Sequence, residues 1–317
     1  MKLSFKLAAL YLVGLLSNCA TLPDTQTATG DASAMELIKR LQKALPGTYS
    51  NFAQINENGS DDPVTDLNIR QLSASGEPVF LFTSAERGSD AMRYDIYWLK
   101  LNPLTKKAEF HFARLTGAEL SLSLQEIIAT AWQRVLPGCV IVLEANPDEL
   151  RGHSRPDTCR FEDPYRGETR IYRMLALGAN SLELETAVMA PGEQHNAGDG
   201  NLIMQKHRLY AGSASIGVDV DPATGDYVEW QESSRFSLFD DGRVVRLYGR
   251  NLLAMGYTAQ LARLHRRAGE PPYLRLAIIN ETSGATQALQ WIKPGSERIE
   301  LNLEWLTIEL EIAPPGG

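Results

Sequence analysis

Periodicity changes within the stretch Leu41-Gln-Lys-Ala-Leu-Pro-Gly-Thr-Tyr-Ser-Asn-Phe-Ala-Gln54. The residues up to position 45 carry apolar side chains at helical spacing, and Pro46-Gly47 ends that pattern. Ser33 and Glu36 have the spacing of a capping box, so we expect the helix to begin there. From Tyr49 to Gln54, apolar or aromatic residues alternate with polar ones, which predicts a strand with one dry and one polar face.

Short segments typical of strands continue along the chain, with turn residues between them. A second capping box, Ser123 with Glu126, predicts one further helix that Leu136-Pro-Gly-Cys139 ends. Short strands separated by turns are the pattern of an antiparallel barrel or sandwich. The predicted strands cover residues 78–83, 93–101, 108–115, 140–144, 149–152, 170–176 and 181–187.

A second small β-domain, with an OB-like barrel as its suggested form, is expected from residue 211 to residue 317. Its predicted strands are 215–220, 234–239, 243–248, 273–279 and 299–305, with a short helix at 259–265. We expect a hairpin turn at Asp240-Asp-Gly242 and a bulge or bend before Ile308, where the apolar phase reverses.

The first residues predict export. Lys2 and Lys6 flank the start of a short apolar run that ends before Cys19, which is the pattern of a signal peptide. Cys19 lies where a bacterial lipobox places its lipidated cysteine, and a plain secretory signal with an incidental cysteine is the alternative. Ala20 after it favours the outer membrane, so we expect a lipid-anchored periplasmic protein. Residues 20–33 have no apolar period and predict a flexible tether.

The other two cysteines predict a disulfide. Cys139 and Cys159 are 20 residues apart, and an even pair in an oxidising compartment is most simply a bridge. A reactive thiol beside His153 is the alternative. The formal charge of −8 is spread along the chain without a Lys/Arg run, which argues against nucleic acid as a partner.

The opening stretch resembles the CpcT/CpeT-type chromophore lyase family, whose members attach or handle open-chain tetrapyrroles. A helix followed by Gly-x-Tyr-Ser-Asn-x-x-Gln is similar to the start of that family's pattern. Leu-Pro-Gly-Cys139, Glu149-Leu-Arg-Gly152, Cys159 and a strand with Tyr172 are similar to its second half. The resemblance covers about residues 35–210, and it implies a calyx-like antiparallel β-barrel over 34–210 with an N-terminal helix.

Two parts of the family pattern are altered here. Met189-Ala-Pro-Gly-Glu-Gln-His-Asn-Ala-Gly-Asp-Gly200 stands in place of the family's acidic Asp-Arg-Gly stretch, and residues 92–97 match its Tyr-Arg-Gln-Arg-type strand only loosely. The implied fold therefore carries over more fully than the implied activity.

The resemblance also implies a pocket that takes a bilin. Such a ligand is long, aromatic and carries two propionates, so its pocket needs aromatic walls and arginines. A lyase would add a carboxylate to protonate or hold the tetrapyrrole. Ordinary barrel packing is the alternative role of the tyrosines. The residues that match the pocket-forming region are Tyr49, Asn51, Gln54, Arg93, Tyr94 and Tyr97, with Glu86 and Arg87 as an acidic-basic pair.

Common catalytic signatures are missing from the sequence, which has no P-loop, His-Glu-x-x-His, Gly-x-Ser-x-Gly or Cys-x-x-Cys motif. None of the five histidines has a metal-binding spacing, so no metal is expected. We expect His111 on the polar face of its strand, and we assign no role to His195 or His207.

Two functions therefore remain open. The first is an exported, lyase-like barrel lipoprotein that binds a bilin or another extended hydrophobic ligand. The second is a non-enzymatic cell-envelope protein whose barrel is a structural or partner-binding module. The expected partners are a membrane, through the lipid on Cys19, and a hydrophobic small molecule. The family resemblance also suggests a homodimer.

Overall fold

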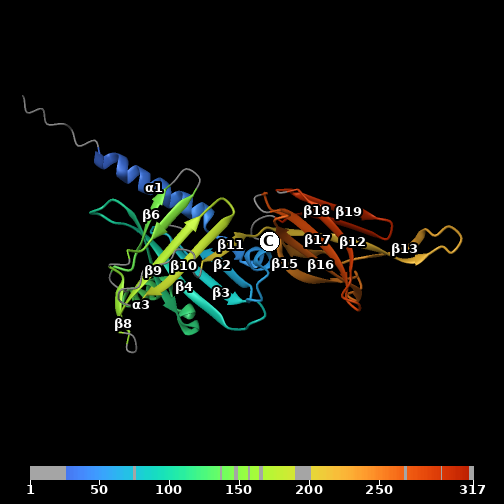
Figure 1. Cartoon of the computed structure of the whole chain (residues 1–317), viewed down its shortest axis with the longest axis horizontal. Helices are drawn as coiled ribbons and strands as arrows, with labels where there is room; N and C mark the ends of the chain where they lie inside the picture. Colours follow the sequence, from blue (N-terminus) through green and yellow to red (C-terminus); the bar gives the residue numbers. More distant parts are fainter. Residues whose placement is uncertain are drawn as a thin grey trace, which may run out of the picture.

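The structure is a computed structural model, and it describes residues 26–73, 76–135, 138–145, 149–155, 158–163, 167–189, 201–267, 270–293 and 295–313. An antiparallel barrel lies beside two further antiparallel sheets (Figure 1). Cys19, the signal segment and the loop with His195 lie outside the described residues. None of the helices in the described ranges is long and apolar enough to cross a bilayer.

The barrel is a closed ring of ten strands, as the predicted fold class requires. The strands follow the order β10-β11-β1-β2-β3-β4-β5-β6-β7-β9, and β9 pairs with β10 to close the ring, while β8 pairs with β9 outside it. The bounds are β1 Gly47–Ser50, β2 Thr65–Gln71, β3 Val79–Glu86, β4 Met92–Leu101, β5 Ala108–Leu115, β6 Ile141–Ala145, β7 Leu150–His153, β8 Arg160–Asp163, β9 Gly167–Leu177, β10 Ser181–Met189 and β11 Leu202–Lys206.

The helix α1 (Gln26–Ala44) starts earlier than the sequence predicts. Ser33 therefore lies inside the helix, and the tether predicted over 20–33 is wrong from Gln26 onward. Once a helix has nucleated on its amphipathic turns, extending it avoids the cost of a new nucleus, which lets it continue toward its N-terminus. The predicted apolar stripe is confirmed, because Leu41 and Leu45 are fully buried in the barrel core.

The strand predicted over positions 49 to 54 is wrong in its second half. β1 ends at Ser50, and the helix α2 (Phe52–Asn58) follows at once. Asn51 lies between them, and its Oδ1 accepts a hydrogen bond from Thr65 N at 2.7 Å, which fixes the turn. An alternation over only six residues fits one continuous strand, and it fits equally a strand that ends and is followed by a helix. The sequence pattern alone does not distinguish the two.

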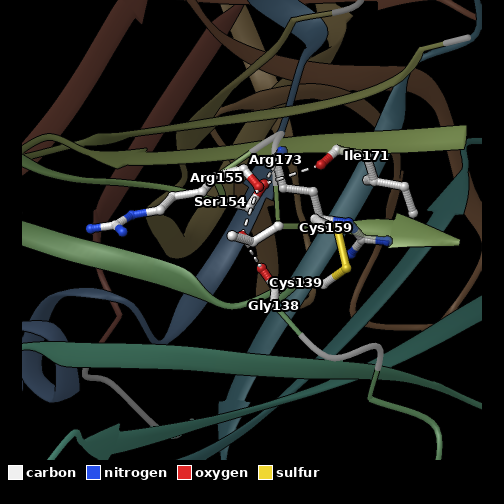
Figure 2. The surroundings of a disulfide bond; sticks show 8 residues. Gly138, Cys139, Ser154, Arg155, Cys159, Ile171 and Arg173 are labelled. Carbon is white, nitrogen blue, oxygen red and sulfur yellow. Dashed lines mark hydrogen bonds between the residues drawn. A yellow bond between two sulfur atoms is a disulfide. The ribbon is translucent and has the colours of Figure 1, made fainter. Parts of the chain in front are cut away.

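The predicted disulfide joins Cys139 to Cys159 (Figure 2). Gly138 has a φ of +78°, and the Cβ of any other residue there would lie 2.3 Å from Thr158 O. The nearby Ser154 Oγ accepts a hydrogen bond from Arg173 N at 2.8 Å, so the bridged loop is connected to β9.

The helix α3 (Leu124–Trp132) covers the outer face of β4 and β5, and its predicted capping box of Ser123 and Glu126 is confirmed. The prediction that His111 lies on a polar face is wrong. Its ring stacks on Trp98, with the centroids 5.8 Å apart, and lies 5.4 Å from the ring of Trp132. Burial under the helix lowers the pKa of His111.

The C-terminal residues form two sheets with one shared core, rather than the single closed sheet of an OB-like barrel. One sheet has the order β13-β12-β20-β19, with β14 also on β12, and the other has the order β15-β16-β17-β18. The bounds are β12 Leu209–Val220, β13 Tyr227–Glu232, β14 Phe236–Phe239, β15 Asp241–Tyr248, β16 Ala254–Leu264, β17 Tyr273–Asn280, β18 Thr286–Ile292, β19 Arg298–Leu303 and β20 Leu306–Ile312.

Three local predictions in this sandwich need correction. The helix predicted over residues 259–265 is wrong, because residues up to Leu264 belong to strand β16. Side chains on both faces of this part of the strand are buried, so a run of apolar residues is expected there. Asp240 does not lie in a hairpin turn, since β14 pairs with β12 and β15 pairs with β16, so the chain crosses between sheets there. The phase change before Ile308 is a tight hairpin in which Leu303 faces Leu306.

Candidate functional site

A cluster of aromatic side chains lies inside the barrel, among a larger number of aliphatic ones. The ring of Tyr97 lies 4.2 Å from that of Phe82, 5.0 Å from that of Phe110 and 5.7 Å from that of Phe112, between centroids. The rings of Phe80 and Phe110 meet edge to face at 5.9 Å. Beyond this cluster, a cavity remains open at one end of the ring.

A cavity of about 370 Å³ lies at the end of the barrel where β3 and β5 finish and β4 begins. We call it the barrel mouth. Arg93, Asp95 and Tyr97 alternate along β4, so period two puts them on one face. The other lining residues are Ser84, Arg114, Ile141, Arg173, Met174, Leu175, Leu184, Glu185, Thr186 and Leu202.

The barrel mouth carries three arginines against two carboxylates. Arg114 forms an ion pair with Asp95, its register partner on the neighbouring strand. Arg173 lies flat on an aromatic ring, with its Cζ 3.7 Å from the centroid of Phe112. Its buried Nε has no hydrogen-bond partner, and no carboxylate of the described residues lies within ion-pair distance of it. The site therefore offers a cation that is not neutralised by an acid.

The hydroxyl of Tyr97 forms the polar part of the floor. Burial raises the pKa of Tyr97, and the nearby Arg173 charge opposes that shift only in part. The phenol is therefore protonated at neutral pH and can donate a hydrogen bond. A neutral hydroxyl beside a guanidinium is a suitable pair for a ligand carboxylate.

Of the eight residues expected to bind a ligand, Arg93 and Tyr97 line the barrel mouth. Glu86 lines a neighbouring cavity of about 240 Å³, which shares Ser84 and Arg93 with it. Sequence reasoning missed Asp95, Arg114 and Arg173. The alternation within β4 could have identified Asp95, but the arginines come from strands that only the barrel closure brings together.

The other predicted residues lie away from the barrel mouth and support the fold. Tyr49 is fully buried and donates to Leu45 O at 2.7 Å, at the end of α1. Tyr94 lies on the outer face of β4. Gln54 hydrogen-bonds to the backbone of Asn201 and Ile203, and Asn51 holds the turn before α2.

Arg87 belongs to an ion network between the barrel and the sandwich. Its Nη2 lies 2.7 Å from Asp66 Oδ1, and its Nη1 donates to Asp241 O at 3.1 Å. Arg243 lies 3.0 Å from both Asp66 Oδ2 and Asp241 Oδ2. The contacts of Arg87 therefore connect the barrel to the sandwich.

His207, to which we assigned no role, lies in a second connection between the two parts. Its Nε2 is 2.8 Å from Ser50 Oγ, and its Nδ1 is 2.9 Å from Asp240 Oδ1, while Arg263 pairs with the other oxygen of Asp240. The order Ser–His–Asp is that of a hydrolase triad. Ser50 is fully buried, however, so its hydroxyl is closed to a substrate and serves as a structural contact.

Within the part of the chain that the structure describes, no group of three His, Cys, Asp or Glu side chains could hold a metal ion. No family model matches this chain, and no curated protein matches it.

Proposed function

We propose that the barrel binds an amphipathic ligand whose carboxylate enters the barrel mouth. The observation that supports this most is Arg173, held on the face of Phe112 with no acidic partner among the described residues. A bilin or another tetrapyrrole is the ligand that the CpcT/CpeT resemblance suggests, since its propionates would pair with that guanidinium.

The size of the barrel mouth limits how much of a ligand can enter. A volume of 370 Å³ is near the lower end of the range for small-molecule pockets, about 300–1,000 Å³. The aromatic cluster behind Tyr97 closes the way further in. An extended ligand would therefore insert one end and cover the neighbouring cavity beside Glu86 with the rest.

Binding is better supported than lyase catalysis. A lyase needs a carboxyl group that can give a proton to the tetrapyrrole. Asp95 is the carboxylate that the sequence pattern would place there, but both of its oxygens already accept hydrogen bonds from Arg114. The proposal is a ligand-binding barrel, exported and anchored through Cys19, with homodimer formation and lyase activity as further expectations of the resemblance.

Absorbance titration with a bilin, biliverdin, tests the proposal. We expect a shift of the bilin spectrum with the purified protein, and at least tenfold weaker binding of the bilin dimethyl ester, which lacks both carboxylates. Arg173→Gln should weaken binding of the free acid to a similar degree. Arg246→Gln, on the far sandwich, is the control and should bind as the unmodified protein does.

The second candidate is a non-enzymatic envelope protein in which the barrel is a structural module. The two ion networks that join barrel and sandwich favour it, because they make the chain one connected unit. The absence of a spectral shift with both the bilin and haem would leave this alternative, and so would an unchanged affinity in Arg173→Gln.

A further inference from the structure

Two adjoining cavities lie where the barrel meets the sandwich, away from the barrel mouth. Their volumes are about 640 Å³ and 390 Å³, and both are lined by Ala179, Asn180 and Arg208. The first two residues belong to the turn between β9 and β10, and Arg208 lies between β11 and β12. We call this paired space the junction cavity.

The junction cavity is lined by cationic side chains. Arg208 lines both halves, and Arg263 and His265 line the larger one. The C-terminal turns of α1 add Arg40 and Lys43 to the smaller half, and the end of β11 adds Lys206. No Asp or Glu is among the described residues that line either half. This local excess of positive charge is unexpected in a chain with a net charge of −8.

Arg208 is fixed by its backbone while its side chain faces the cavity. Its N–H donates to Asp240 Oδ1 at 2.8 Å, and its carbonyl accepts from Asp240 N at 3.2 Å. Its guanidinium contacts the hydroxyl of Tyr210, and no carboxylate in the described ranges lies within ion-pair distance of it. Asp240 therefore positions this arginine without neutralising it.

Lys206 is a second cation with donors to spare. Its Nζ donates to Ala44 O at 2.7 Å, at the end of α1, and lies 5.7 Å from the centroid of the Tyr49 ring. That one bond leaves two of its three N–H groups for another acceptor. Burial lowers the pKa of Lys206, and an anion beside it would compensate that effect.

The remaining basic residues of the larger half are already paired. Arg263 bonds to Asp240 and donates to Lys206 O at 3.0 Å, and His265 bonds to Glu57. In the smaller half, Arg40 already takes part in another interaction, and His207 is bonded to Ser50 and Asp240. The cations considered for a ligand are therefore Arg208 and Lys206, with the exposed Lys43 at the rim.

From these observations we infer that the junction cavity binds a small anion of the phosphate class, a free phosphate or an organic phosphomonoester, between Arg208, Lys206 and Lys43. Lys43 comes from α1, whereas Lys206 and Arg208 come from the end of β11 and the residues that follow it. Three cations around one space suit a doubly charged phosphate better than a singly charged carboxylate. The 640 Å³ half next to it has room for the organic part of a phosphomonoester.

Isothermal titration of the full chain with inorganic phosphate, glycerol phosphate and acetate tests the inference. We expect saturable binding of the first two, weakened by added salt, and at least tenfold weaker binding of acetate. Glycerol phosphate binding more tightly than phosphate would assign a phosphomonoester, and equal affinities would assign free phosphate. No binding of either phosphate at millimolar concentration overturns the inference.

The variants separate this site from the barrel mouth. Arg208→Gln should weaken phosphate binding at least tenfold, since it removes a charge-assisted donor. Lys43→Gln, a change on the exposed last turn of α1, should weaken it severalfold and is the comparison to use if Arg208→Gln does not fold. Arg250→Gln is an exposed control and should bind normally. Arg173→Gln should also keep phosphate affinity, so failure of the barrel-mouth proposal and failure of this one give different results. Unchanged affinity in both Arg208→Gln and Lys43→Gln contradicts the inference.

Discussion

Nδ1 of His207 lies 2.9 Å from Oδ1 of Asp240, and both side chains are almost completely closed to solvent. The other ring nitrogen reaches Ser50 in the barrel, so one hydrogen-bond chain connects β1 with the loop that joins the two sheets of the sandwich. Arg263 on β16 completes it. Asp240 is therefore one of two buried carboxylates that connect the sandwich to the barrel, and Asp241 is the other.

Asp240→Asn should destabilise the protein strongly. The change leaves Arg263 buried without its counter-charge, and breaking a buried ion pair from one side costs about 3–5 kcal/mol. Urea denaturation measures the loss. Asp219→Asn, at an exposed position where Oδ1 accepts a hydrogen bond from Val220 N, is the matched control and should change stability little. Equal stability of the two variants would contradict the role given to Asp240.

The stability of the unmodified protein should fall in acid partly through the same group. Burial alone would raise the pKa of Asp240, but the bond from His207 and the charge of Arg263 more than offset it, so the pKa is held below the ordinary value of 3.8. A carboxyl with a lowered folded-state pKa stabilises the protein fully above its unfolded-state pKa and loses that contribution as the pH falls toward the folded-state value. Denaturation midpoints measured from pH 5 downward should decline below about pH 4, and the decline should be shallower in Asp240→Asn.

The sequence was informative where local patterns and folded structure agree. Strands β3, β4 and β5 are short runs rich in apolar and aromatic residues and bounded by turn residues, which favours strands. The capping box at Ser123 marks α3 because its bonds lie within four residues. The prediction from the sequence was wrong at Asp240, because the turn-like residues Asp-Asp-Gly are also compatible with a crossover between sheets. Only the pairing of distant strands distinguishes the two.

The candidate site was predictable in part for the same reason. Arg93 and Tyr97 share a face of one strand, so their common position follows from period two. Arg173 lies 76 residues after Tyr97 in the chain, and it reaches Phe112 because both side chains point into the closed ring, in which β9 is the third strand after β5. His207 seemed an isolated histidine because its partners, Ser50 and Asp240, are far from it in the chain.

Removing the disulfide should lower the stability of the barrel. Cys139 and Cys159 are separated by 20 residues, and closing a loop of that length contributes about 3 kcal/mol in the chain-entropy model. We expect the double change Cys139→Ala and Cys159→Ala to lose about that much in urea denaturation. Reductant should destabilise the unmodified protein by a similar amount and leave the double variant unchanged. A reductant effect on both would mean that the bridge is not the cause.

Gly138→Ala should destabilise the same loop without removing a bond. The φ of +78° is unfavourable for alanine by about 1–2 kcal/mol, and its Cβ would also lie 2.3 Å from Thr158 O. Gly284→Ala is a matched control, since Gly284 has a φ of +68° but nothing within 4 Å of the added Cβ. We expect Gly138→Ala to lose clearly more stability than Gly284→Ala. Equal losses of stability in the two variants would show that the short distance from the added Cβ to Thr158 O does not destabilise the loop.

The two tyrosines of β4 provide the sharpest test of the barrel mouth. Tyr97 points into the barrel beside Arg173, whereas Tyr94 packs on the outer face, so Tyr97→Phe and Tyr94→Phe make the same chemical change on opposite sides of one strand. Loss of a hydrogen bond to a charged group costs about 1.5–3 kcal/mol, so Tyr97→Phe should weaken binding of a carboxylate-bearing bilin by about tenfold or more. Tyr94→Phe should bind it unchanged. Absorbance titration of both variants, with circular dichroism to verify the fold, measures the difference. If the two variants bind equally well, the ligand carboxylate does not reach the floor of the barrel mouth, because the hydroxyl of Tyr97 is the donor that the cavity offers there.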